Sequence, residues 1–117
     1  MQKDLVAFQL VKFLEARGVE KIFGLCGHTV IGFLDALKDS SIQYISVRHE
    51  QIAAHAADGY ARGKNCKVPG VVMTHLGPGL TNATTGVAEA GLNSIPMVVI
   101  AGDVPTCYFG RHPHQEV

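Results

Sequence analysis

The chain has 117 residues, of which 47% are hydrophobic and 17% charged, and its formal net charge is zero with neutral histidines. This composition predicts one folded domain or part of one, and it excludes a disordered chain. Because Lys and Arg form no basic stripe, we expect neither nucleic acid nor an anionic membrane as a partner. The longest apolar stretches are far shorter than the roughly 20 residues that a membrane-spanning helix needs.

The pattern of cysteines is typical of a protein in a reducing compartment. Cys26, Cys66 and Cys107 are odd in number and widely spaced, and no Cys-x-x-Cys occurs. Free thiols and a cytoplasmic location are therefore predicted. His112 and His114 lie near Cys107, but this pattern favours a solvated tail over a metal site, so we predict no metal ligands in this chain.

Hydrophobic periodicity predicts helices that alternate with strands along the whole chain. Helices are expected at 4–17, 30–37 and 50–63 and, after a turn at 77–79, through 93, and strands at 21–25, 42–47, 71–74 and 96–100. Continuous apolar strands that alternate with helices predict an α/β fold, a three-layer, doubly wound parallel sheet. The polar tail after the last strand does not close this sheet, so we expect it to be incomplete at its C-terminus.

Two predicted helices carry small side chains on the faces that periodicity assigns to the core. The expected buried faces are Ile52, Ala53, Ala56, Ala57 and Tyr60 in one helix, and Leu80, Ala83, Thr84, Val87, Ala88 and Gly91 in the other. Gly86 adds to the small face of the second helix. Small faces permit close backbone approach, either of the helices onto their own sheet or between two subunits. Both interpretations stay open on the sequence alone.

Unusual residues follow each predicted strand, at 26–28, 48–50, 75–79 and 102–103. Carboxyl ends of parallel strands meet at one edge of the sheet, where ligands bind in open α/β folds. Glu50 stands there at the start of a helix. A helix N-terminus favours a charged, capping carboxylate, whereas an apolar cleft favours one that holds its proton and serves in acid–base chemistry. The four turns together favour a ligand site.

The turn Gly77-Pro78-Gly79 leaves a second kind of site open. The next glycine, Gly86, is at the wrong spacing for a dinucleotide-binding fingerprint. A phosphate can nevertheless bind at the N-terminus of the helix that follows. A non-catalytic phosphate- or nucleotide-binding α/β module is therefore the alternative to an enzyme, and a self-associating interaction domain is a third hypothesis.

Segments 47–51, 53–62, 77–82 and 93–100, in this order and with fitting spacing, resemble the thiamine-diphosphate-dependent enzymes of the acetolactate synthase and pyruvate oxidase group. The resemblance is to their N-terminal, pyrimidine-binding domain, and it implies that residues 1–117 are most of such a domain. It implies a 2-oxo-acid decarboxylase or carboligase that uses thiamine diphosphate, with Mg²⁺ on a separate domain. It also implies a homo-oligomer, a dimer or tetramer formed through the small-residue helices, in which this chain alone is inactive.

The resemblance also implies roles for individual residues. Glu50 would hydrogen-bond the aminopyrimidine ring and help to remove the thiazolium proton, and Gln115 would be a second catalytic residue on the substrate side. The expected cofactor contacts, besides Glu50, are Leu25, Cys26, Gly27, His75, Pro78 and Asn82.

Several cleft positions depart from the pattern of the family. Cys26 replaces a common proline, His75-Leu76 replaces Thr-Ser, and 111–114 replaces Thr-Asp-Ala-Phe. The acyl donor and acceptor therefore stay open, and an anionic one that binds Arg111 and the histidines is one interpretation.

Overall fold

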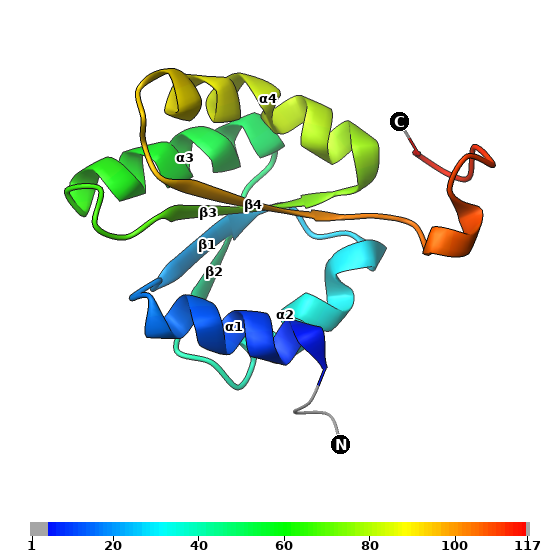
Figure 1. Ribbon diagram of the computed structural model, residues 1–117, viewed down its shortest axis with the longest axis horizontal. Helices are drawn as coiled ribbons and strands as arrows, with labels where there is room; N and C mark the ends of the chain where they lie inside the picture. The colour runs from blue at the N-terminus through cyan, green and yellow to red at the C-terminus, as the bar shows by residue number, and fades with distance from the viewer. Residues whose placement is uncertain (1–4, 117) are drawn as a thin grey trace.

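The computed structural model describes residues 5–116, which form three layers, with a sheet between two pairs of helices. Helices α1 and α2 cover one face of the sheet, and α3 and α4 cover the other (Figure 1). In chain order the elements are α1 (Val6–Ala16), β1 (Lys21–Gly24), the 3₁₀ turn η2 (His28–Val30), α2 (Ile31–Leu37), β2 (Gln43–Ser46), α3 (Glu50–Gly63), β3 (Gly70–His75), α4 (Leu76–Leu92), β4 (Met97–Gly102) and the 3₁₀ turn η3 (Thr106–Tyr108). The predicted fold class is confirmed.

The sheet has the strand order β2-β1-β3-β4, and every pair of neighbouring strands is parallel. After β1 the chain moves outward to β2, and it then crosses back over β1 to form β3. Strand order therefore reverses between β1 and β3, and such a switch point opens a crevice at the carboxyl ends of the two strands. The turn after β1 and the start of α4 lie at this crevice.

The core has two parts, one on each face of the sheet. On the α1/α2 side, Phe8, Leu14 and Phe33 pack against Ile22 and Met73. On the α3/α4 side, a smaller cluster lies under the two helices and consists of Phe23, Ala53, Ala54, Ala57, Val72 and Ala83. Strand β3 is central and buried over most of its length, which is why its sequence is apolar without alternation.

The predicted buried faces of α3 and α4 are wrong in part. Ile52 and Leu80 are 55% and 44% exposed, and Thr84, Ala88 and Gly91 are also exposed. The residues that are buried instead include Ala54 and Ala61 in α3, and Leu76, Gly79, Gly86 and Ala90 in α4. Beyond their first turns, both helices turn alanine and glycine inward and leave Ile52 and Leu80 exposed.

The two helices lie close together, and this explains why small side chains face inward. A Cβ atom on Gly86 would lie 2.5 Å from the Cβ of Ala54 and 3.1 Å from the backbone of His55. A Cβ on Gly70, in β3, would overlap the carbonyl of Ala57. Small residues therefore pack α3 onto α4 and onto the chain's own sheet, as one of the two open interpretations expects.

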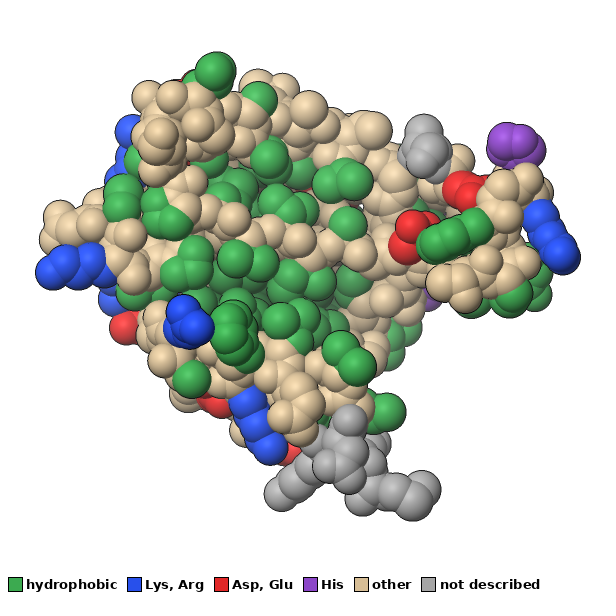
Figure 2. All heavy atoms as spheres, viewed as in Figure 1, with side chains coloured by type: hydrophobic (Ala, Val, Ile, Leu, Met, Phe, Trp, Pro, Cys, Tyr) green, Lys and Arg blue, Asp and Glu red, His purple; other side chains and the backbone are tan. Residues whose placement is uncertain are grey.

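The edge of the sheet at β4 carries apolar side chains that are only half buried, Met97, Val98, Val99 and Ile100. Figure 2 shows apolar side chains gathered between the two helical layers on this side of the molecule. No strand among residues 5–116 pairs with the outer edge of β4. The expectation of an incomplete sheet stays a prediction.

After β4 the chain leaves the body of the fold and forms η3 (Figure 1). Tyr108 and Phe109 in this tail are about half exposed, at 50% and 52%. No helix in the described part of the chain is both long and apolar enough to span a bilayer.

Candidate active site

Glu50 lies at the carboxyl edge of the sheet, in the first turn of α3. His49 caps this helix, because its Nδ1 accepts a hydrogen bond from the backbone N–H of Gln51 at 3.2 Å. Glu50 is 7% exposed. A helix N-terminus also stabilises a carboxylate that is exposed to water, so the position at the start of α3 does not by itself explain this burial. The predicted position of Glu50 at the start of a helix agrees with the structure, and the residue is buried there.

The two oxygens of the Glu50 carboxyl group have different surroundings. Asn82, in α4, donates a hydrogen bond from Nδ2 to Oε2 of Glu50 at 3.1 Å. Oε1 accepts no hydrogen bond from any residue between 5 and 116. A Cβ on Gly79 would lie 3.2 Å from Oε1, so the missing side chain leaves space beside this oxygen. One oxygen is thus held in place, and the other is available to a ligand.

Thr74 completes this side of the site, and sequence reasoning missed it. Its side chain is fully buried, and its Oγ1 has no hydrogen-bond partner in the described chain. Its Cβ lies 3.4 Å from the position of a Cβ on Gly79, so it sits below the turn that faces Glu50. The sequence feature that could have identified Thr74 is its hydroxyl group near the end of an otherwise apolar strand.

His75 lies on the opposite side of β3, because successive side chains of a strand point to opposite faces. Its Nδ1 is 2.8 Å from Oγ1 of Thr29, and its ring makes an edge contact with the ring of His28, with the centroids 4.7 Å apart. Burial lowers the pKa of His75, and the neighbouring His28 and His114 lower it further, whereas Glu50 opposes them. His75 is therefore a neutral ring at neutral pH.

The junction between β3 and α4 has an unusual backbone. Leu76 has a positive φ of 52° and is 2% exposed, a conformation that costs an L-residue free energy and is held by the surrounding structure. The next backbone N–H, of Gly77, donates a hydrogen bond to the carbonyl of Gln115 at 3.3 Å. The tail thus returns to the sheet edge, where a cavity of about 100 Å³ is lined by Leu76, Gly77, Leu80, Ala101, Gly102 and Asp103.

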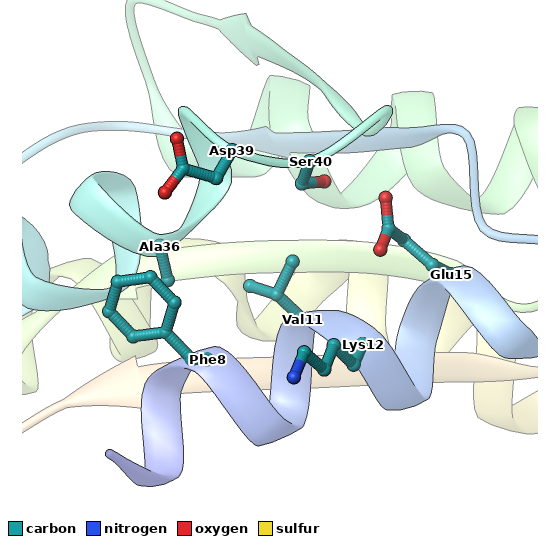
Figure 3. Close-up of a pocket in the computed structure, with 7 residues that line it drawn as sticks. All are labelled: Phe8, Val11, Lys12, Glu15, Ala36, Asp39 and Ser40. Carbon is teal, nitrogen blue, oxygen red and sulfur yellow. The ribbon is translucent and has the colours of Figure 1, made fainter. Parts of the chain in front are cut away.

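A larger cavity, of about 330 Å³, lies elsewhere, between α1 and the loop after α2 (Figure 3). Its lining residues are Phe8, Val11, Lys12, Glu15, Ala36, Asp39 and Ser40. The carboxylate of Glu15 there already accepts hydrogen bonds from the N–H and the hydroxyl of Ser41, at 2.7 and 2.8 Å. Size alone therefore does not identify the site. The sheet edge differs because it combines a buried carboxyl group with a switch point in strand order.

The structure brings some of the predicted site residues together and leaves others apart. Glu50 and Asn82 are in contact, and Gly27 packs so closely against the ring of His75 that a side chain there would overlap it. Cys26, Pro78 and Gln115 are exposed, and no hydrogen bond within residues 5–116 joins their side chains to Glu50. Leu25 is half buried and extends the β1–β3 ladder through a long hydrogen bond to Met73. The roles of these residues stay predictions.

No group of three or more His, Cys, Asp or Glu side chains that could hold a metal ion gathers in the part of the chain that the structure describes. The N-terminus of α4, the alternative phosphate site, has its Gly77 N–H bonded to the chain's own Gln115 carbonyl. That occupation does not favour the phosphate-binding alternative.

A doubly wound sheet with a buried carboxylate at its switch point defines a class of α/β proteins that bind a ligand at the carboxyl edge. Comparison with known families identifies the class more closely. Residues 5–117 match the family described as "Thiamine pyrophosphate enzyme, N-terminal TPP binding domain". The chain belongs to this family, and the predicted resemblance is confirmed.

Curated relatives agree with this assignment. The chain is 46% identical to the probable acetolactate synthase large subunit of Methanocaldococcus jannaschii over 108 residues, which are 92% of this chain and 18% of that protein. It is 44% identical to the acetolactate synthase isozyme 3 large subunit of Escherichia coli over 111 residues, 94% of this chain and 19% of that protein. The chain thus spans about a fifth of the length of these relatives.

Proposed function

We propose that residues 1–117 are most of the pyrimidine-binding domain of a thiamine-diphosphate-dependent 2-oxo-acid decarboxylase or carboligase that resembles acetolactate synthase. The observation that carries this proposal is the carboxyl group of Glu50, which is buried, fixed at Oε2 by Asn82 and free at Oε1. The family match and the relatives named acetolactate synthase support it. A small-molecule 2-oxo acid is the proposed substrate class.

The residues at the sheet edge fit the aminopyrimidine ring of thiamine diphosphate. Oε1 of Glu50 can accept a hydrogen bond from a ring N–H or share its proton with a ring nitrogen, and the absent side chain of Gly79 leaves room next to it. When bound, the cofactor supplies a thiazolium carbon that adds to a carbonyl group and accepts the electron pair released on decarboxylation.

The chain's own residues would bind and orient this ring. Glu50 would hold or move a proton at Oε1, and Asn82 would fix the direction of the carboxyl group through Oε2. We place Leu25, Cys26, Gly27 and Pro78 around the pyrimidine because the first three follow β1 and Pro78 begins α4, at the switch point. Gln115 is proposed on the substrate side, because its backbone already reaches Gly77.

The proposal extends to the assembly that the family resemblance implies. Mg²⁺ would bind with the cofactor's diphosphate on a separate domain. The protein would be a homo-oligomer, a dimer or tetramer, formed through the outward face of α3 and α4, where Gly59, Thr84 and Ala88 are exposed, small and uncharged. A cytoplasmic location is proposed because all three cysteines are free and exposed thiols.

The test is Glu50→Gln in the natural-length protein, which keeps the shape of the side chain but removes its acid–base function. We expect the exchange of the cofactor's thiazolium proton with D₂O, followed by NMR, to slow by about 100-fold or more. The matched control is Glu20→Gln, since Glu20 is an exposed carboxylate paired with Lys64 far from the site. An exchange rate in Glu50→Gln equal to that of the wild type would overturn the proposal.

A further inference from the structure

A polar cluster on the α2 side of the sheet edge is not used by the proposed proton chemistry of Glu50. It consists of His28 and Thr29 in η2 and His75 at the end of β3. The Thr29 hydroxyl is 2.8 Å from Nδ1 of His75, and the rings of His28 and His75 meet edge to face at 73°. These contacts fix the plane and the direction of the His75 ring.

Two glycines make this arrangement possible. Any side chain on Gly27 would overlap the ring of His75, and any side chain on Gly102 would overlap the hydroxyl of Thr29. Both glycines follow or end a strand at the carboxyl edge. Gly102 also lines the cavity of about 100 Å³ beside Leu76, but none of the three residues of the cluster lines it. The cluster is therefore packed from both sides by glycine backbone.

The other ring nitrogen of His75 is available to a ligand. Nε2 has no hydrogen-bond partner in the chain from residue 5 to residue 116, and neither ring nitrogen of His28 has one. Oγ1 of Thr29 contacts only Nδ1 of His75 among the described side chains. A threonine hydroxyl both donates and accepts hydrogen bonds. When it donates to Nδ1, the proton of the neutral ring is on Nε2, which then is a hydrogen-bond donor.

The titratable groups around the ring are two imidazoles and one carboxyl group. The titratable groups that act on His75 are His28 from η2, His114 from the tail and Glu50 from α3, and together with burial they lower its pKa. Two of these three neighbours are imidazoles, which repel a proton on His75 when they carry one. An anionic oxygen at Nε2 would reverse this balance, and the ring would bind a proton more tightly.

We propose that His75 determines substrate specificity by donating a hydrogen bond from Nε2 to a carboxylate oxygen of the 2-oxo acid, with Thr29 as the residue that positions the ring. This inference rests on the proposed function, because that function supplies the substrate class. It assigns the aminopyrimidine to Glu50 and the substrate's carboxylate to His75, in place of the cofactor contact that the family resemblance implies for His75.

The experiment uses the natural-length protein, loaded with thiamine diphosphate and Mg²⁺, and follows the ¹⁵N signals of the His75 ring during titration with pyruvate, 2-oxobutyrate and 2-oxoglutarate. We expect at least one of these 2-oxo acids to shift the Nε2 signal and to raise the apparent pKa of His75. Thr29→Val should broaden or abolish this response, whereas Thr29→Ser, which keeps the hydroxyl, should retain it. No response of Nε2 to any of the three acids would overturn the inference.

Two substitutions of His75 separate a binding role from a structural one. An Asn amide lies near the position of Nδ1 and a Gln amide near that of Nε2, so His75→Asn should raise KM for the responding acid about tenfold or more. His75→Gln should stay within about threefold of wild type and lose the pH dependence of kcat/KM that His75 causes. Equal KM values in the two variants would contradict the proposal.

The exchange of the thiazolium proton distinguishes this inference from the proposed function. If Glu50→Gln slows exchange but pyruvate, 2-oxobutyrate and 2-oxoglutarate leave Nε2 unchanged, the inference about His75 fails and the proposed function stands. If Glu50→Gln leaves exchange unchanged, both fail.

Discussion

At the scale of single residues, the hydrogen bond from Asn82 to Glu50 should contribute to the free energy of unfolding, because its acceptor is a buried carboxyl group. Asn82→Ala leaves Oε2 of a buried carboxyl group without a donor. We expect the free energy of unfolding to fall by about 1 to 3 kcal/mol, measured by urea denaturation.

Asn93→Ala is the control at an exposed site, because Asn93 donates from Nδ2 to Oε1 and to the backbone carbonyl of Glu89, each at 2.9 Å, and both side chains are exposed. Water replaces both hydrogen bonds, so the loss should stay within about 0.5 kcal/mol. Similar losses in the two variants would show that Glu50 gains nothing from its burial beside Asn82.

His75 should make the stability of the fold depend on pH. Its pKa in the folded chain lies below the ordinary value of 6.5 because of burial, His28 and His114. Above pH 6.5 the ring is neutral in both states. As the pH falls below 6.5, the unfolded chain binds a proton that the folded chain does not, so the free energy of unfolding decreases until the pH passes below the folded pKa. Urea denaturation between pH 7.5 and about 5 measures this decrease.

The substitution His75→Gln isolates this contribution from those of the other histidines. The variant should lose less free energy of unfolding than the wild type over the same pH range, because its amide does not titrate. The test is whether the wild type or the variant loses more free energy of unfolding as the pH falls. A variant that loses more stability than the wild type on acidification would mean that the folded chain favours the protonated ring of His75.

At the scale of elements, the contact between α3 and α4 depends on Gly86. Gly86→Ala places a Cβ against Ala54, where neither backbone can move far, so we expect the free energy of unfolding to fall by about 1 to 3 kcal/mol. Gly91→Ala in the same helix is the control. Gly91 is exposed with no atom within 4 Å of a new Cβ, so alanine should raise stability by up to about 1 kcal/mol. A gain in both variants would contradict the packing described here.

The elements show which part of the fold periodicity can predict. The start of α3 at Glu50 and the end of α4 within one residue of Asn93 followed from local signals, and both agree with the structure. The buried faces of these helices did not follow, because Ile52 and Leu80 are apolar and yet exposed. Burial there depends on how closely two backbones approach, and the sequence contains that only as the spacing of small residues such as Gly86 and Ala54.

The same limit applies to the candidate site. Glu50 and Asn82 could be placed together, because the strand-end rule put Glu50 at the carboxyl edge and the family resemblance put Asn82 near the same cofactor. The contact of Thr29 with His75 could not be predicted, because Thr29 lies in a short 3₁₀ turn and reaches His75 only when β1 and β3 are neighbouring strands. A contact between residues 46 positions apart depends on strand order, which the sequence pattern did not provide.

At the scale of the whole molecule, the two helical layers differ in what they present to solvent. The helices α3 and α4 expose the small, uncharged Gly59, Thr84 and Ala88, together with the charged Arg62 and Glu89. The α1 side exposes Lys12 and Arg17. Lysine is well solvated on a free surface but costly within a closely packed interface. If only one layer binds a second subunit, a lysine added to that layer should weaken subunit association, and a lysine added to the other layer should not.

Ala88→Lys tests the proposed homo-oligomer on this basis. Lysine favours helix nearly as well as alanine, so the fold should tolerate it on the exposed face of α4. In the natural-length protein we expect sedimentation velocity to show a dissociation constant raised tenfold or more, about 1.4 kcal/mol, because the interface would have to bury an unpaired charge. Ala16→Lys makes the same change at an exposed position of α1 and should leave the association unchanged. If Ala88→Lys sediments as the wild type does, the subunits associate through another surface.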